Sequence, residues 1–191
     1  MIFLTIRHGE TDYNKEGRAM GSAIDAPLNE TGIKQAHELE RKLEAYRPTA
    51  FYSSPLLRTK QTAEIINRYF NLPIAYRDEL KERDVGTLAG IRFSDIKKQH
   101  GIDPFGLEYD FRPFGGESSD DVRKRIRSFL GYMRERHTGK ETLLIVTHSE
   151  IIRLMYVFFQ VEARDICNAC IHNFKDMQTL IRNDFGTEKA V

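Results

Sequence analysis

Arginine and histidine side chains follow short apolar runs at three places in the chain. Arg7 and His8 come directly after one run, and His148 follows another. Arg58 falls in the first turn of a helix predicted to begin after a third run. Two guanidinium and two imidazole groups at one place would repel one another, and a multiply charged oxyanion would relieve that repulsion. Phosphate is the natural candidate, because a guanidinium matches its oxygens in bidentate pairs.

The elements predicted around these residues bring them to one edge of a sheet. Four apolar, β-favouring runs are predicted as strands: residues 2–6, 50–52, 73–76 and 143–146. Three stretches with apolar residues at helical spacing are predicted as helices, with start signals at Asn29, Ser54-Pro55 and either Ser118 or Ser119. Residues 171–174 and 177–181 are predicted as a C-terminal hairpin. Alternating strands and helices indicate an α/β fold with a mainly parallel sheet, whose ligands bind beyond the strands' carboxyl ends.

Length and composition narrow the class of protein. A chain of 191 residues, 40% hydrophobic and 30% charged, favours a single globular domain over residues 1–191. The 29 basic and 28 acidic residues give a net charge of +1, which argues against nucleic-acid and membrane-surface binding. No apolar stretch approaches the ~20 residues of a membrane span, and a cytoplasmic protein is expected.

The two cysteines, Cys167 and Cys170, have a C-x-x-C spacing. Even with His172 they leave a tetrahedral zinc site one ligand short, so no metal is expected there. Two cysteines are too few for a disulfide-stabilised fold. The sequence therefore predicts two partly buried thiols in a reducing compartment.

Several sequence blocks resemble the histidine phosphatase superfamily, the group that includes the cofactor-dependent phosphoglycerate mutases. In chain order they are Arg7-His8-Gly9-Glu10-Thr11 with Asn14, Pro27-Leu28-Asn29-Glu30-Thr31-Gly32, Ser53–Ala63, Leu80-Lys81-Glu82 with Gly86 and Gly90, Gly115-Gly116-Glu117-Ser118, and Val146-Thr147-His148. Together they extend from residue 2 to about residue 160. The resemblance implies a three-layer α/β/α sandwich with a mainly parallel central sheet.

The resemblance also implies a role for each site residue. His8 would attack phosphorus and form a phosphohistidine, with its other ring nitrogen donating to a fixed acceptor such as a backbone carbonyl. Arg7, Arg58 and His148 would hold the phosphate oxygens and stabilise the charge of the transition state. Glu82 would protonate the leaving oxygen and then accept a proton from the attacking water.

Further donors and one alternative acid complete the expected site. Asn14 would add a neutral donor, although it could serve only to cap a turn. Ser149 follows the second histidine, where the family commonly offers a backbone N–H to phosphate. Asp84 stays open as an alternative to Glu82 for the proton transfer. Glu150 departs from the family pattern. It is expected to point away from the phosphate or to pair with an arginine such as Arg153. If its side chain faces the pocket, it suggests a substrate that carries a positive charge.

Three functions are compatible with these residues. A metal-independent phosphomonoesterase without a cofactor is preferred, because the chain is short for a mutase that must exclude water. A cofactor-dependent phosphoglycerate mutase and a non-catalytic phospho-ligand or protein-binding module are the alternatives. A small phosphorylated substrate is expected, and a phosphoprotein stays open. The segment 86–116, rich in glycine and aromatic residues, is predicted as a lid or specificity segment.

Overall fold

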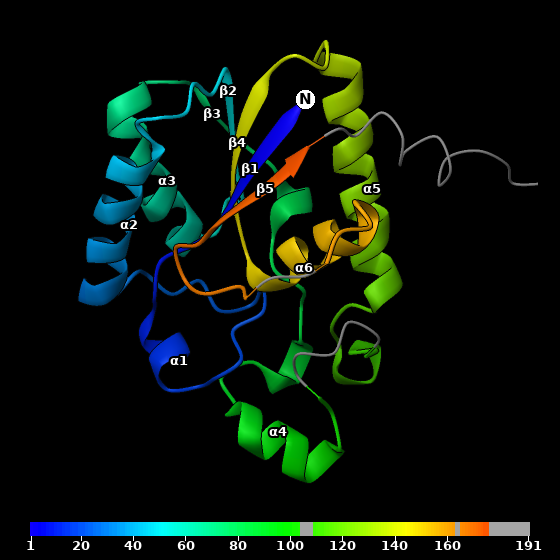
Figure 1. The fold of residues 1–191 in the computed structure, drawn as a ribbon. Helices are drawn as coiled ribbons and strands as arrows, with labels where there is room; N and C mark the ends of the chain where they lie inside the picture. Colours follow the sequence, from blue (N-terminus) through cyan, green and yellow to red (C-terminus); the bar gives the residue numbers. More distant parts are fainter. Residues whose placement is uncertain (104–108, 163–164, 176–191) are drawn as a thin grey trace, which may run out of the picture.

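The centre of the molecule is a five-stranded sheet in the order β3-β2-β4-β1-β5 (Figure 1). The strands are β1 (Ile2–Arg7), β2 (Ala50–Ser53), β3 (Ile74–Tyr76), β4 (Thr142–Thr147) and β5 (Ile171–Lys175). Strands β1 to β4 pair in parallel, and β5 pairs antiparallel with β1. The structure is a computed structural model that describes residues 1–103, 109–162 and 165–175. The predicted mainly parallel sheet is confirmed.

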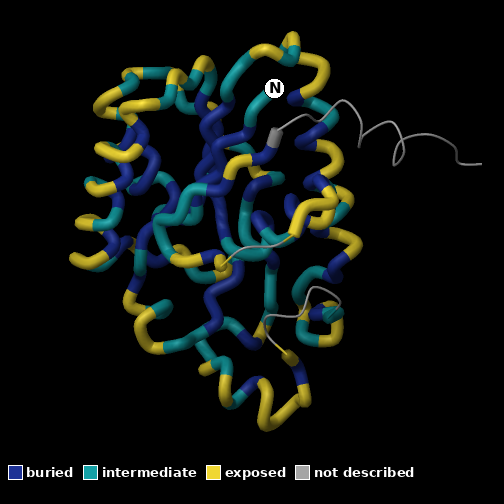
Figure 2. The backbone as a smooth tube through the Cα atoms, viewed as in Figure 1, coloured by how far each residue is buried: buried dark blue, intermediate teal, exposed yellow. Residues whose placement is uncertain are grey.

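Helices cover both faces of this sheet (Figure 1). On one face lie α2 (Glu30–Leu43) and α3 (Leu57–Phe70), and on the other lie α5 (Ser119–Arg136) and α6 (Ser149–Phe158). Leu144 packs into the core under α2 and α3, whereas its neighbours Leu143 and Ile145 pack into the core under α5 and α6. Both faces of β4 are therefore buried, which explains its unbroken apolar run. Figure 2 shows this buried centre between exposed outer turns.

Two of the predicted helix starts are confirmed, and one is wrong. Asn29 accepts a hydrogen bond from the Gly32 amide at 2.9 Å, and Ser118 caps α5. The helix predicted to begin at Ser54 instead begins at Leu57, with no side-chain cap. The Ser54 hydroxyl has another partner in the site, which removes it from the role of cap.

The chain returns to the sheet edge through residues 165–170 before β5. Residues 171–174 form a strand as predicted, but their partner is β1, and residues 177–181 lie outside the described part of the chain. The prediction of two free thiols is wrong, because a disulfide joins Cys167 and Cys170, whose Cα atoms are 5.4 Å apart. This separation is within the usual range for a disulfide. In the described ranges, no helix has the length and apolar character to cross a bilayer.

The described parts of the segment 86–116, residues 86–103 and 109–116, lie below the carboxyl ends of the parallel strands, as does α1 (Asp12–Lys15) (Figure 1). It contains α4 (Phe93–His100) and two short 3₁₀ turns, η2 (Gly86–Leu88) and η3 (Arg112–Phe114). Leu88, Ile96 and Phe111 form a small core of their own with Ala19. Of the aromatic residues in this segment, Phe105 lies outside the described residues.

Candidate active site

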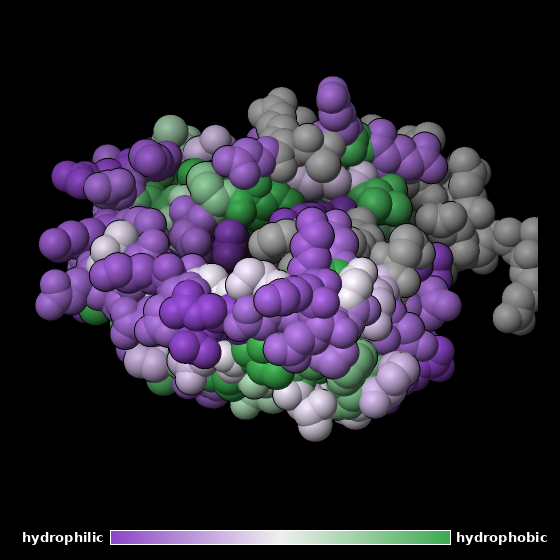
Figure 3. Space-filling model, turned by 90° about the horizontal axis from the view of Figure 1, so that it is seen from below, coloured by the Kyte–Doolittle hydropathy of each residue, from purple (hydrophilic) through white to green (hydrophobic). Residues whose placement is uncertain are grey.

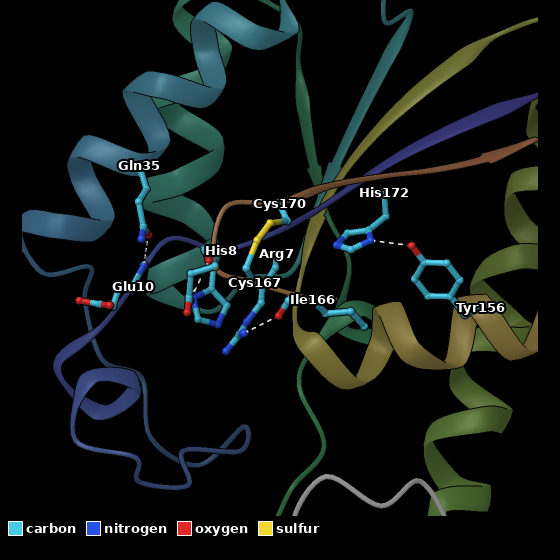
Figure 4. Close-up of a disulfide and its surroundings, with 10 residues drawn as sticks. Arg7, His8, Glu10, Gln35, Tyr156, Ile166, Cys167, Cys170 and His172 are labelled. Carbon is cyan, nitrogen blue, oxygen red and sulfur yellow. Dashed lines mark hydrogen bonds between the residues drawn. A yellow bond between two sulfur atoms is a disulfide. The ribbon is translucent and has the colours of Figure 1, made fainter. Parts of the chain in front are cut away.

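Strand register places the two candidate histidines side by side. Arg7 is the register partner of Thr147 in the parallel pair β1–β4, so His8 and His148 leave the sheet together. Their ring centroids are 5.2 Å apart, and both side chains are buried. Nδ1 of His8 lies 2.7 Å from the Gly9 carbonyl oxygen; Figure 4 shows the His8 ring beside Arg7. Because a carbonyl only accepts, Nδ1 carries the proton and Nε2 keeps its lone pair.

Two arginines, the buried Arg58 and the half-buried Arg7, lie beside this histidine pair. Arg58 donates through Nη1 to the Ile24 carbonyl at 3.0 Å and through Nη2 to the Gly21 carbonyl at 2.8 Å. Arg7 donates through Nη1 to the Ile166 carbonyl at 2.8 Å (Figure 4). Backbone carbonyls therefore fix the direction of both guanidinium groups before any ligand binds.

Three buried nitrogens of this group have no hydrogen-bond partner among the described residues: Nε of Arg7, Nε of Arg58 and Nδ1 of His148. Unpaired buried donors cost about 1–3 kcal/mol each. An oxyanion bound between these side chains would offset that cost, so the site favours an anionic ligand.

Burial sets the protonation state of the two histidines. It lowers the pKa of His8 well below its ordinary value, and the charges of Arg58 and Arg7 lower it further. The pKa of His148 is lowered by burial, then by Arg58 and His8. Burial also lowers the pKa of Arg58, to about 10, so this guanidinium stays charged at neutral pH. The site thus combines neutral imidazoles with cationic guanidiniums.

Glu82 and Ser149 meet in the lining of the same pocket. The Ser149 hydroxyl donates to Oε2 of Glu82 at 3.2 Å, and both residues line the pocket. Asp84 is turned to its own loop, where its carboxylate accepts from the Gly86 amide at 2.8 Å. Of the two acids, Glu82 is therefore the one placed to reach a ligand beside His8.

Glu150 lines the pocket as well, and its partner is Arg83 instead of Arg153. Oε2 of Glu150 lies 2.9 Å from Nε of Arg83, whose side chain is 1% exposed. Burial, and next the charge of Glu82, raise the pKa of Glu150 to about 8. Two neighbouring carboxyl groups, those of Glu82 and Glu150, therefore line the pocket. The buried Arg83 pairs with Glu150 and links α6 to the loop that carries Glu82.

The mouth of the pocket is formed by α1, α4 and the loops beside them. Asn14 completes the cap of α1, as one of its two predicted roles requires, and it also lines the pocket, where its role as a donor to phosphate stays a prediction. Phe93 and Phe111 line the pocket too, whereas Tyr109 and Phe114 pack against the small core of segment 86–116. Viewed from below, this end of the molecule is largely hydrophilic with hydrophobic side chains between (Figure 3). Within the described ranges, no group of His, Cys, Asp or Glu is arranged to hold a metal ion.

A family model described as the histidine phosphatase superfamily, branch 1, matches residues 3–175. The chain belongs to this family. It is 31% identical over 175 residues to an uncharacterized phosphatase, PhoE, of Bacillus subtilis, covering 89% of this chain and 86% of that one. It is 37% identical over 158 residues to a metal-independent phosphoserine phosphatase of Arabidopsis thaliana, covering 80% and 66% of the two chains. Among solved structures, a mycobacterial glucosyl-3-phosphoglycerate phosphatase shares the fold, with a TM-score of 0.79, 24% identity and coverage of 90% and 91%.

Sequence reasoning missed two residues of this histidine phosphatase site. Oγ of Ser54 lies 2.9 Å from Nε2 of His148, which orients that ring. Arg83 connects the loop of Glu82 to Glu150, and its Nη1 donates to the Tyr109 carbonyl at 2.7 Å and to Oγ of Ser119 at 3.1 Å, which ties in segment 86–116 and the start of α5. Ser54 belongs to the block Ser53–Ala63 that also contains Arg58, and this shared block could have indicated that Ser54 lies in the site. Arg83 follows Glu82 directly, but nothing local predicts its partner.

Proposed function

We propose that this histidine phosphatase hydrolyses phosphomonoesters without a metal, through a phosphohistidine on His8. The observation that carries the proposal is the His8 Nδ1 contact with the Gly9 carbonyl, at 2.7 Å, in a ring whose pKa is depressed by burial. This contact leaves the Nε2 lone pair available for attack, between two guanidinium groups that attract the phosphate.

In the first step, Nε2 of His8 forms a bond to phosphorus while the bond from phosphorus to the ester oxygen breaks. Glu82, in its protonated form, gives the proton to the departing oxygen, so the alcohol leaves neutral. Arg7, Arg58 and His148 hold the three remaining oxygens and stabilise their charge in the transition state. Asn14 and the backbone N–H of Ser149 supply further donors to the same oxygens.

In the second step, water attacks the phosphohistidine. Glu82, now ionised, accepts a proton from that water while the bond from phosphorus to nitrogen breaks. Inorganic phosphate leaves, and His8 and Glu82 return to their starting states. Water is the acceptor that we favour over a second substrate hydroxyl, because the relatives reported above are named phosphatases.

Burial of the nucleophile supports a small substrate. The side chain of His8 is only 2% exposed and lies at the base of a pocket with both charged and aromatic walls. A phosphate on a folded protein surface would have to enter this pocket, whose lining includes Phe93, Ile96 and Phe111, to touch it. We therefore infer a small phosphorylated metabolite, with O-phosphoserine the first compound to test because a relative carries that activity in its name.

The test measures phosphate release from a panel of small phosphomonoesters in the presence of EDTA. We expect release to survive EDTA and to fall at least ~10³-fold in His8→Ala, because the nucleophile is lost. Rapid quenching of the native enzyme should trap an acid-labile phosphoenzyme that the variant does not form.

His37→Ala is the control, because His37 lies on α2, away from the pocket, and should leave turnover unchanged. Release that persists in His8→Ala, or that EDTA abolishes, contradicts the proposal. Isomerisation of 3-phosphoglycerate with its bisphosphate primer, without phosphate release, would identify a mutase instead.

A further inference from the structure

The loop between α6 and β5 forms hydrogen bonds with the backbone of the histidine segment, residues 7 and 8. The amide of Ala169 donates to the Arg7 and His8 carbonyls at 3.1 and 3.2 Å. Nδ2 of Asn168 donates to the His8 carbonyl at 3.2 Å and to Oδ1 of Asn14 at 3.3 Å. Residues 168 and 169 therefore fix the backbone of the segment from which the nucleophile and one phosphate-binding arginine project.

The same loop also aims the Arg7 guanidinium. The carbonyl of Ile166 accepts from Nη1 of Arg7 at 2.8 Å, and the next residue is Cys167 (Figure 4). Every one of these contacts comes from residues 166–169, and the disulfide between Cys167 and Cys170 encloses two of those residues. The proposed phosphatase chemistry uses neither sulfur atom.

We infer that Cys167 and Cys170 form a thiol–disulfide exchange site that controls how firmly Arg7 and His8 are held. The inference rests on the proposed function of that site. Cys167 is exposed and Cys170 is half-buried, so an external thiol can reach the sulfur of Cys167. The class of reactant is a dithiol in the reducing direction and an organic disulfide in the oxidising direction.

The exchange balances in both directions. A thiolate of the external dithiol attacks Sγ of Cys167, the Cys167–Cys170 bond breaks, and Cys170 leaves as a thiolate that takes up a proton. The second thiol of the reductant then attacks the mixed disulfide and releases Cys167. Two electrons and two protons pass to the cysteine pair, and the reductant becomes a disulfide.

The disulfide limits the conformations open to residues 167–170, and reduction removes that limit. The contacts of Asn168, Ala169 and Ile166 with the histidine segment then compete with a larger set of loop conformations. A net hydrogen bond is worth ~0.5–1.5 kcal/mol, so weakening one such contact changes binding by about two- to ten-fold. We expect the reduced enzyme to bind phosphate more weakly by that factor and to lose a similar part of kcat/KM.

The experiment titrates the full-length protein through mixtures of oxidised and reduced dithiothreitol. Three quantities are followed together: the number of free thiols, kcat/KM for a phosphomonoester, and the Kd of inorganic phosphate measured by calorimetry. We expect kcat/KM and the Kd of phosphate to change with the same midpoint as the number of free thiols. Cys167→Ser, Cys170→Ser and the double variant should stay at the value of the reduced enzyme and ignore dithiothreitol.

Unchanged activity and unchanged phosphate affinity across a complete thiol titration would overturn the inference. So would cysteines that form no disulfide in oxidised dithiothreitol, or variants that still respond to the reductant. The phosphate measurement separates the thiol–disulfide proposal from the phosphatase proposal. A protein that hydrolyses no phosphomonoester but binds phosphate in a redox-dependent way would contradict only the phosphatase proposal.

Discussion

Glu82 is the residue whose role depends most on the chemistry of the leaving group. Its carboxyl accepts from the Ser149 hydroxyl at 3.2 Å and lines the same pocket as Arg7 and Arg58. We expect Glu82→Gln to lower kcat/KM by ~10²–10⁴-fold for alkyl phosphates, whose alkoxides need a proton. Aryl phosphates with an acidic phenol should lose far less, because that leaving group departs unprotonated.

A series of phosphomonoesters with graded leaving-group acidity measures this difference, and Asp84→Asn serves as the matched control. Equal losses of the Glu82→Gln variant across the series would rule out Glu82 as the proton donor. A steep dependence in Asp84→Asn would assign the proton to that residue.

Glu150 introduces a pH dependence of a different kind. Its pKa, raised by burial and by Glu82 to about 8, leaves it largely neutral at pH 7; Arg83, Arg125 and Arg153 are the cations that oppose the rise. Above pH 8 the group ionises and adds a negative charge to the wall of the pocket in which we propose that a phosphate dianion binds. We therefore expect KM for a phosphomonoester to rise as pH passes through about 8.

Glu150→Gln, neutral at every pH, should remove this rise in KM. Glu38→Gln, on the exposed face of α2, should keep it. Profiles of KM against pH from 6 to 9.5 make the comparison, and a rise that survives in Glu150→Gln would show that another group causes it.

At the scale of secondary-structure elements, the first turn of α2 supports the loop that follows His8. A Cβ atom built on Gly32 would lie 2.1 Å from the Glu10 carbonyl oxygen, so the two backbones touch. The Glu10 amide also donates to Oε1 of Gln35 at 2.9 Å (Figure 4). We expect Gly32→Ala to destabilise the protein by ~1–3 kcal/mol and to lower kcat/KM, because the loop must move away.

Gly131 is the matched control, since it lies within α5 and a Cβ there would meet nothing within 4 Å. Gly131→Ala should stabilise by about 0.5–1 kcal/mol through helix propensity and leave kinetics unchanged. Urea unfolding and steady-state rates compare the two variants. A Gly32→Ala protein as stable and as active as the native one would disprove the positioning role of α2.

At the scale of the whole molecule, two buried neutral histidines make the fold sensitive to acid. The folded-state pKa values of His8 and His148 are depressed, mainly by burial, whereas both imidazoles titrate near 6.5 in the unfolded chain. Below that pH the unfolded state takes up protons that the folded state does not. Stability is therefore lost as pH falls, by about 1.4 kcal/mol per histidine between pH 7.5 and 5.5.

Urea denaturation at those two pH values measures this loss in the native protein. His8→Asn should reduce the difference by about half, because one of the two depressed groups is gone. His37→Asn should not change it, because the His37 side chain is 44% exposed. An unchanged pH dependence in His8→Asn would contradict the assignment.

The sequence by itself determined the order of the elements and predicted most of the basic side chains that the structure brings together at the candidate site. Apolar runs and helical spacing are local properties, so β1, β2 and β4 and the caps at Asn29 and Ser118 could be predicted from short windows. The same holds for Arg7, His8, Arg58 and His148, because each follows a strand or begins a helix at the carboxyl edge of the sheet.

Only the tertiary structure decided which distant side chains meet. Ser54 reaches His148 across 94 residues, because β4 pairs with both β1 and β2 and thereby places their carboxyl ends together. Strand order and the packing of α6 and β5 likewise decide that Arg83 pairs with Glu150. They also decide that residues 166–169 form hydrogen bonds with Arg7 and His8. Such contacts depend on the register and packing of elements far apart in the chain, which no local pattern encodes.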